Sequence, residues 1–246
     1  MADAKSVQRL NGVALWRQIA DRIRVAIADG SYDGEGRVPP EIQLAAQFGV
    51  NRHTVRAALA ALAQEGIVRA VQGRGTLIER RERISFPITR RTRFTEGVGH
   101  QARALEGILL SSAEEPVSGE VAVALGLSPG TPVLRIHALR KADGRAVSTS
   151  TSWFPLPRFA GMSKAYQETG SITRAFSACG LEDYVRVTTD ISATHADQAD
   201  LEALELAPGA IVLVTRATNA DLEGRPVQFA VTRFPADRVQ LTVSNP

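Results

Sequence analysis

Residues 41–78 read EIQLAAQFGVNRHTVRAALAALAQEGIVRAVQGRGTLI, and this stretch decides the fold of the first part of the chain. Its first eight residues carry apolar side chains at helical spacing, and the glycine that follows ends the predicted helix. Asn51 is a favourable N-cap for a second helix, in which Val55, Leu59 and Leu62 share one face. Two short helices joined by a tight turn are the plan of a helix-turn-helix.

The start of the second helix carries side chains that donate hydrogen bonds and that lie away from its apolar face. They are Arg52, His53, Thr54 and Arg56. The first turns of a recognition helix meet base edges in the major groove, so this placement predicts contact with DNA. Two alternatives stay open at this point. The helix pair also fits an ordinary helical domain, and the arginines also fit a solvated face, with His53 as a cap or a packing residue.

A hairpin is predicted directly after the two helices. Two short strands flank a Gln-Gly-Arg-Gly turn at residues 72–75, where glycine allows the backbone to approach a sugar-phosphate chain closely. Arg74 is then placed to enter the minor groove or to pair with a phosphate. Upstream, residues 15–29 have the spacing of a supporting helix. Together these elements predict a winged helix-turn-helix domain over residues 1–78.

In their order and spacing, residues 15–78 resemble the GntR family of regulators. The resemblance is carried by VPPE at 38–41, LA at 44–45, FGVNR at 48–52, TVR at 54–56 and QGRGT at 72–76. It implies that the residues at the DNA are Arg37, Glu41, Arg52, Thr54, Arg56 and Gly73. The sequence departs from the family at Pro40 and Asn51, where the family more often has Ser. Asn51 keeps the capping chemistry, whereas Pro40 lacks a hydroxyl for a phosphate contact.

Residues 79–92, ERRERISFPITRRT, are highly charged, contain Pro87 and lack a sustained periodicity. We interpret them as an interdomain linker. Two readings of the linker stay open. Arg90, Arg91 and Arg93 add phosphate contacts in one of them, and the linker is solvated without a role in DNA binding in the other.

The remainder of the chain contains a duplication. The segment that starts with ALGLSPG at Ala124 parallels the segment that starts with ALELAPG at Ala203. The two match at an offset of 79 and, after one inserted residue, of 80, as for Phe154 and Phe234. Each copy reads as a helix, a Pro-Gly turn, a strand, a polar turn and a strand. Two copies predict an α+β domain with a mainly antiparallel sheet and a cleft between the equivalent hairpins, which is a natural ligand pocket.

This second part resembles the UTRA ligand-sensing domain of the HutC branch of the GntR family, which shares its fold with chorismate lyase. The resemblance is carried by RFT at 93–95, the two Leu-x-Pro-Gly turns, LR at 139–140, GSI at 170–172 and ISA at 191–193. It places the sensing domain at residues 93–246. VNRHT at 50–54 and FP at 86–87 are most similar to the phosphonate-utilisation regulators of that branch.

The resemblance also implies where a small anionic effector binds. The matching positions are Thr95, Arg140, Ser171 and Thr173, and further candidates are Ser148, Ser150, Thr232 and Arg233. A phosphate or phosphonate prefers a guanidinium with several neutral donors, and Arg140 supplies that charge. The family often has Arg where Ala138 stands and Tyr where Thr173 stands, which weakens the case for a phosphosugar. In the alternative reading, Arg140 is a surface strand residue and Ser171 is only an N-cap.

Charge and composition agree with this division. Residues 1–93 carry 16 Lys and Arg against 9 Asp and Glu, whereas residues 94–246 carry 13 against 17, so the basic part is the one predicted to bind DNA. The single Cys179 forms no internal disulfide, and no Cys/His cluster has zinc-ligand spacing. Without a secretory signal or a long apolar run, the sequence predicts a cytoplasmic protein that uses no metal or cofactor.

We therefore expect a transcription repressor that binds a double-stranded DNA operator as a homodimer. A small anionic effector, a phosphonate or a phosphate ester, is expected to control it, and genes of organophosphorus metabolism are the expected targets. The alternatives are a regulator of phosphosugar or amino-acid catabolism, a DNA-binding protein without an effector, and a lyase-like enzyme. No nucleophile motif, nucleotide-binding glycine loop or recognisable carboxylate pair supports an enzyme, so no catalytic residue is predicted.

Overall fold

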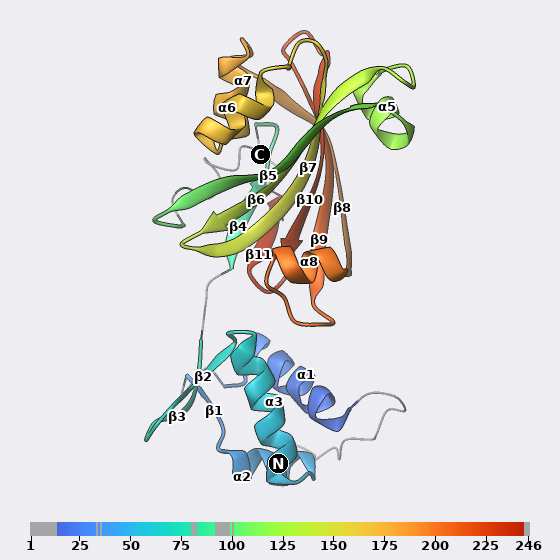
Figure 1. Cartoon of the computed structure of the whole chain (residues 1–246). Helices are drawn as coiled ribbons and strands as arrows, with labels where there is room; N and C mark the ends of the chain where they lie inside the picture. Colours follow the sequence, from blue (N-terminus) through green and yellow to red (C-terminus); the bar gives the residue numbers. More distant parts are fainter. Residues whose placement is uncertain are drawn as a thin grey trace. The chain divides into compact units, whose positions relative to one another are not determined.

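The computed structural model describes residues 14–32, 34, 36–79, 83–91, 99 and 101–243 (Figure 1). The chain divides into two compact units, an N-terminal unit Met1–Arg81 and a C-terminal unit Glu82–Pro246. Each unit has hydrophobic clusters of its own. Among the described helices, none combines the length and the apolar character that crossing a bilayer requires.

The N-terminal unit is a winged helix-turn-helix, as the sequence predicts. Its elements are α1 (Leu15–Ala28), β1 (Arg37–Val38), α2 (Glu41–Phe48), α3 (Arg52–Gln64), β2 (Val68–Val71) and β3 (Gly75–Ile78). The three helices meet in a core where Ile19, Ile23, Leu44 and Leu62 have no exposed surface. β2 and β3 form the predicted hairpin, and β1 adds a third strand in the order β1-β3-β2. This strand is an addition to the predicted wing.

The C-terminal unit is built on one antiparallel sheet with the strand order β5-β6-β7-β10-β9-β8. Its elements are β4 (Ile84–Ile88), β5 (Leu105–Pro116), α5 (Gly119–Leu125), β6 (Pro132–Ala142), β7 (Arg145–Pro155), α6 (Met162–Thr169), α7 (Ile172–Ala178), β8 (Val185–His195), α8 (Gln198–Ala203), β9 (Ile211–Ala220), β10 (Pro226–Pro235) and β11 (Val239–Val243). The predicted α+β class with a mainly antiparallel sheet is confirmed.

The sheet is assembled from the two copies of the repeat. The first copy is β5-α5-β6-β7 and the second is β8-α8-β9-β10, and they meet where β7 pairs with β10. Thr151 pairs with Val231, its equivalent 80 residues later, so a pseudo-twofold axis passes between these two residues. Each copy includes one strand more than the sequence predicts. β5 and β8 have diverged too far for the repeat to be seen in them.

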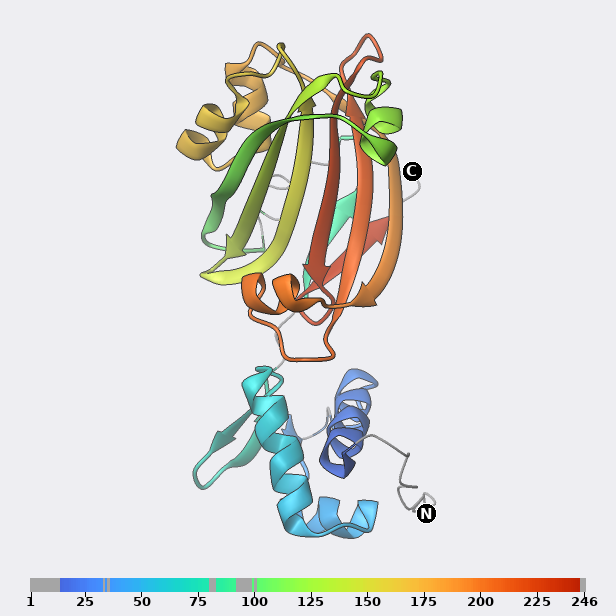
Figure 2. The ribbon, with the colours of Figure 1, turned by 45° about the vertical axis from the view of Figure 1, so that its right-hand side comes forward.

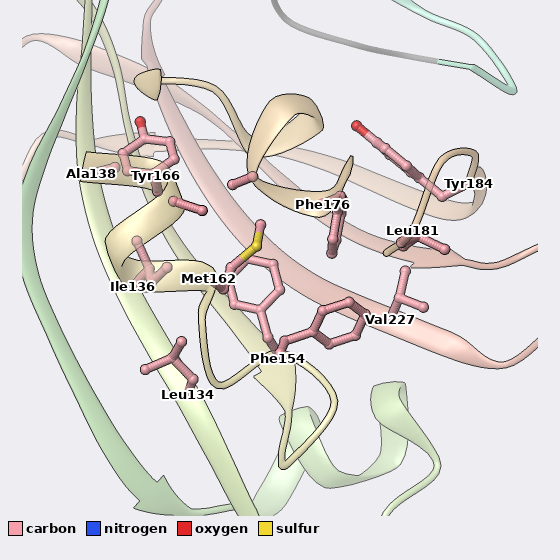
Figure 3. Packing of buried hydrophobic residues seen from close by; sticks show 13 residues of the cluster. Leu134, Ile136, Ala138, Phe154, Met162, Tyr166, Phe176, Leu181, Tyr184 and Val227 are labelled. Atoms are coloured by element: carbon pink, nitrogen blue, oxygen red, sulfur yellow. The ribbon is translucent and has the colours of Figure 1, made fainter. Parts of the chain in front are cut away.

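The two faces of the sheet are covered by different elements. Figure 2 shows α5 and α8 in front of the sheet and β4 and β11 behind it. Along β6, Val133 packs beneath α5, whereas Leu134 and Ile136 belong to the core under α6 and α7, because successive side chains of a strand point to opposite faces. In Figure 3, Met162 and Phe176 of these helices lie next to Phe154.

The stretch predicted as a linker contains a strand. Residues 84–88 form β4, which pairs in parallel with β11, and Phe86 is buried with its ring centroid 5.2 Å from that of Phe234. Pro87 favoured the linker interpretation because proline cannot donate to a ladder. In a two-stranded sheet with one free side, a proline is tolerated. Apart from Glu79, the described residues of the stretch 79–92 therefore belong to the C-terminal unit.

Candidate functional site

The start of α3 is held by the predicted cap. The side-chain oxygen of Asn51 accepts hydrogen bonds from the backbone amide of Thr54 at 2.8 Å and from its hydroxyl at 3.0 Å. This satisfies an amide that would otherwise be left without a partner at the helix N-terminus. Val55 is fully buried, whereas Arg52, His53 and Arg56 are exposed. The predicted DNA-contacting side chains thus lie together on the free face of the first turns.

Glu41 joins this group in a way that the sequence did not reveal. Its carboxylate accepts hydrogen bonds from Nε and a terminal nitrogen of Arg56, at 3.1 and 2.9 Å, and lies 3.7 Å from a terminal nitrogen of Arg52. Hydrogen bonding from Arg56 holds the pKa of the Glu41 carboxyl below its usual value. Glu41, from α2, therefore fixes the direction of two arginines of α3.

The other residues of this unit that are predicted to contact DNA lie in the wing. Arg37 of β1, with Gly73 and Arg74 of the β2–β3 turn, borders a shallow depression together with Leu77. Gly73 has φ +77°, a conformation that other residues rarely adopt, so a glycine is required for this turn. The depression presents two guanidinium groups beside exposed backbone. Proteins commonly contact the phosphates of DNA with this combination of groups.

The C-terminal unit holds a cavity of about 70 Å³ on the face of the sheet that α6 and α7 cover. Its lining side chains come from both copies of the repeat, from the α6–α7 turn and α7, and from β4. They are Phe86, Arg140, Ser148, Ser150, Ser152, Ser171, Ile172, Thr173, Tyr184, Arg186, Thr215, Asn219, Gln228, Ala230, Thr232 and Phe234. We call this cavity the polar pocket.

Most of the predicted effector residues lie together in the polar pocket. Arg140, Ser150, Ser171 and Thr173 line it, as do the further candidates Ser148 and Thr232. Ser171 also caps α7, since its hydroxyl oxygen accepts the backbone amide of Arg174 at 3.4 Å. The hydroxyls of Thr173 and Tyr184 are hydrogen-bonded to each other at 2.9 Å.

Arg233 is a correction to the predicted set, because it does not line the polar pocket. Its Nε donates to Asp200 of α8 at 2.6 Å, and a terminal nitrogen lies 3.3 Å from Asp197. Thr232 lines the pocket, and adjacent residues of a strand point to opposite faces, so Arg233 faces the α8 side of the sheet. Thr95 lies outside the described residues.

Several pocket residues were missed from the sequence. Asn219 donates from Nδ2 to Oε1 of Gln228 at 2.7 Å, and Gln228 donates from Nε2 to the hydroxyl of Ser152 at 3.0 Å. Nε of Arg186 donates to Oδ1 of Asn219 at 3.2 Å. The repeat offered a signal for two of them, since Asn219 is equivalent to Arg140 and Gln228 to Ser148, at offsets of 79 and 80.

The electrostatics of the polar pocket favour an anion. Arg140 and Arg186 are half-buried, and burial lowers the pKa of both guanidinium groups, whereas none of the described lining residues is a carboxylate. The hydroxyl of Ser148 is fully buried and has no hydrogen-bond partner among the described residues. A buried hydroxyl without a partner is costly, and a bound acceptor would remove that cost. The pocket therefore has the charge and the free donor that an anion requires.

Comparison with known families gives one match for each unit. The model of "Bacterial regulatory proteins, gntR family" matches residues 15–78, and the model of "UTRA domain" matches residues 100–240. Both matches fall on the elements that carry the two candidate sites.

Individual proteins match over nearly the whole chain. An HTH-type transcriptional regulator of Rhizobium meliloti (strain 1021) is 60% identical over 98% of each chain. The protein named "Probable transcriptional regulator PhnF" of Escherichia coli (strain K12) is 32% identical over 85% of this chain and 86% of its own. The crystal structure of PhnF from Mycobacterium smegmatis has a similar fold, with a TM-score of 0.63, 24% identity, and coverage of 90% of this chain and 98% of the other.

Proposed function

Because the chain belongs to the GntR family of bacterial regulatory proteins and carries a UTRA domain, we propose that it is a repressor whose polar pocket binds a small organic phosphonate or phosphate ester. The coarser function, a transcriptional regulator and not an enzyme, follows from the family. The observation that carries the proposal is the pairing of Arg140 with Ser148 on neighbouring strands. Arg140 supplies a desolvated charge, and Ser148 supplies a buried donor that has no partner among the residues the structure describes.

The phosphonate assignment rests on chemistry and on resemblance. A phosphonate presents a tetrahedral group with three acceptor oxygens, which suits one guanidinium surrounded by serine and threonine hydroxyls. Ser148, Ser150 and Ser171 provide such hydroxyls beside Arg140. VNRHT at 50–54 is also similar to the phosphonate-utilisation regulators, so we propose genes of organophosphorus metabolism as the targets.

For DNA binding, we propose that base edges are contacted by Arg52, His53, Thr54 and Arg56 of α3. The sugar-phosphate backbone of the DNA is contacted by the wing residues Arg37, Gly73 and Arg74. Glu41 takes part by holding Arg52 and Arg56 in place. The regulator acts in the cytoplasm as a homodimer, because two identical recognition helices read the two half-sites of a pseudo-palindrome. Occupation of such an operator excludes other proteins from it, which is sufficient for repression.

An effector changes operator affinity only if it binds two states of the regulator unequally. Phe86 offers a route for this in the proposed mechanism. It lines the polar pocket from β4, the first strand of the C-terminal unit, which begins only five residues after Glu79, the last described residue of the N-terminal unit. Contact between an effector and Phe86 would act on the chain just where it leaves the DNA-binding unit.

The experiment for DNA binding uses fluorescence anisotropy with the duplex upstream of the protein's own gene. Arg52→Ala and Arg56→Ala are each expected to weaken specific binding by about 1–3 kcal/mol, as for an arginine that contacts a base. Arg174→Ala removes an equal charge from an exposed position of α7 and serves as the control. If both recognition-helix variants bind as tightly as the wild type, the proposed DNA interface is wrong.

A further inference from the structure

Two arginines line the polar pocket from strands near opposite edges of the sheet. Arg140 stands on β6 of the first copy and Arg186 on β8 of the second, with β7, β10 and β9 between them. Four interstrand steps separate their backbones by about 19 Å across the strands. The register adds an offset along the strands, because the row through Arg140 reaches β8 at Ala193, seven residues from Arg186. The two long side chains nevertheless line the same pocket. A single compact anion beside Arg140 leaves the Arg186 end of the pocket without a counter-charge. The second arginine therefore needs an explanation of its own.

Arg186 has no internal counter-ion in the described part of the chain. Its Nε donates to the neutral oxygen of Asn219, and its two terminal nitrogens have no hydrogen bond or ion pair with a described residue. Arg158 and Arg233, which are also in this unit, are each paired with a buried aspartate. A half-buried guanidinium that donates only to an amide keeps most of its desolvation cost uncompensated.

The groups around Arg186 fix its position. Asn219, Gln228 and Ser152 are almost fully buried and form a chain of hydrogen bonds that ends on Arg186. This chain engages the Asn219 oxygen, one donor of each amide group and the Ser152 hydroxyl. Of the donors that the described residues offer at this end of the pocket, the terminal nitrogens of Arg186 have no hydrogen bond to another described residue. Such a planar pair of N–H groups matches a carboxylate or a second phosphoryl group.

We infer that Arg186 is a second anchor for the effector and selects molecules that carry an acidic group at each end. One acidic end is held by Arg140 and Ser148, and the other by the terminal nitrogens of Arg186. Between them the pocket presents the hydroxyls of Ser150, Thr215 and Thr232, which accommodate a short polar or aliphatic connection. The inference rests on the proposed function, since it assigns the class of effector for the same pocket.

The test measures binding of matched probes by calorimetry to the full-length protein. Phosphonoacetate, 3-phosphonopropanoate and 4-phosphonobutanoate are compared with ethyl-, propyl- and butylphosphonate, which have equal chain lengths and no carboxylate. At the best-fitting length, the carboxylate is expected to tighten binding about ten-fold or more, the effect of one charge-assisted hydrogen-bonded pair. 2-Aminoethylphosphonate, with a cation at the second end, is expected to bind no more tightly than ethylphosphonate.

The variants separate the two ends of the pocket. Arg186→Gln is expected to remove the preference for the carboxylate while changing the affinity for alkylphosphonates less than three-fold or so, because Gln keeps a donor without charge. Arg186→Lys keeps the charge and is expected to retain part of the preference. Arg140→Gln is expected to weaken the binding of both probe series. Arg174→Gln, at an exposed position, is expected to change the binding of neither series. Thermal melting of each variant verifies that it is folded.

The outcomes distinguish this inference from the proposed function. If no phosphonate of either series binds the wild type, the proposed anion site is wrong and the inference with it. If alkylphosphonates bind through Arg140 but the carboxylate gives no gain at any length, the second anchor is wrong and the anion site stands. An equal loss for both probe series in Arg186→Gln and Arg186→Lys assigns Arg186 a purely structural role, which also overturns the inference.

Discussion

The two copies of the repeat share the same arrangement of strands and differ in how their equivalent pocket side chains are hydrogen-bonded. In the first copy, Arg140 of β6 stands opposite Ser148 of β7; in the second, the equivalent Asn219 of β9 stands opposite Gln228 of β10. Both copies also carry a β-bulge at the same place, beside these pairs. Asn219 and Gln228 are hydrogen-bonded to each other, whereas the Ser148 hydroxyl has no partner in the described part of the chain.

This difference indicates how a symmetric scaffold acquires an asymmetric site. A bulge changes the direction of nearby side chains, and two equivalent bulges aim two equivalent pairs at one pocket. Where the pair is a complementary amide pair, it satisfies itself and forms a wall. Where the pair is a cation and a hydroxyl, the Ser148 hydroxyl has no partner among the described residues and can donate to a ligand beside the Arg140 charge. Duplication set the geometry of the pocket, and divergence set its chemistry.

The first prediction concerns the edge strands, where the contrast between the copies is greatest. Gly107 of β5 and Arg186 of β8 are equivalent, and each stands opposite a member of the pairs above. A Cβ at Gly107 would overlap the backbone carbonyl of Gly170, so β5 lies directly against the turn that carries Ser171. Gly107→Ala is expected to lower the free energy of unfolding of the C-terminal unit by about 3 kcal/mol, because backbone atoms must move.

Urea denaturation of the full chain measures this effect, with Gly161→Ala as the matched control. A Cβ at Gly161 would meet only the sulfur of Cys179, at an ordinary 3.7 Å, so little change is expected. Phosphonate binding should also weaken in Gly107→Ala, since Ser171 follows Gly170 directly. Equal stability of the two alanine variants would show that the first copy does not depend on this close approach.

Local signals in the sequence were sufficient for the helices and the hairpin of the N-terminal unit, although not for β1. The Asn51 cap and the apolar face of α3 depend on residues three and four apart, and the structure places them as predicted. In the C-terminal unit, Arg233 was assigned to the pocket although the neighbouring residue lines it, because the sequence does not show which face of β10 is covered. Arg186 was missed because β8 is an edge strand with a largely exposed pattern, and only the pairing with β9 brings it to Asn219.

The second prediction compares the two equivalent pairs that line the pocket. Asn219→Ala removes the donor to Gln228 and the acceptor for Arg186, and it is expected to cost about 2 kcal/mol of unfolding free energy because buried polar groups lose their partners. Ser148→Ala removes a buried hydroxyl that no described residue hydrogen-bonds, so it is expected to be neutral or to stabilise by up to about 1 kcal/mol without effector.

The same denaturation experiment, repeated with saturating propylphosphonate, sharpens the comparison. The ligand should stabilise the wild type more than Ser148→Ala, because the hydroxyl becomes useful only when an acceptor is present. Losses of similar size for Asn219→Ala and Ser148→Ala in the absence of ligand would contradict the view that Asn219 is satisfied by its neighbours while the Ser148 hydroxyl awaits an acceptor.

The smallest expected difference between the copies is their response to acid. Asp221, at the end of β9, is buried and accepts hydrogen bonds from Arg158 at 2.7 Å and from Nε of Arg225 at 2.8 Å, whereas its equivalent in the first copy is Ala142. Burial raises the pKa of the Asp221 carboxyl, but hydrogen bonds from Arg158 and Arg225 outweigh burial and lower this pKa to about 2. A carboxyl with a lowered pKa in the folded state stabilises the protein above its unfolded pKa of about 4 and loses that contribution as pH falls towards 2.

Asp221→Asn should therefore be less stable than the wild type by about 1 kcal/mol at neutral pH, a value reduced by the solvent exposure of both arginines. The gap should close between about pH 4 and pH 2, where the wild-type carboxylate becomes protonated. Denaturation midpoints across this range measure it, with Asp190→Asn, an exposed substitution of equal charge on β8, as the control. A gap that stays constant down to pH 2 would mean that the ion pairs of the second copy add nothing to its stability, and that the copies differ only in their pocket residues.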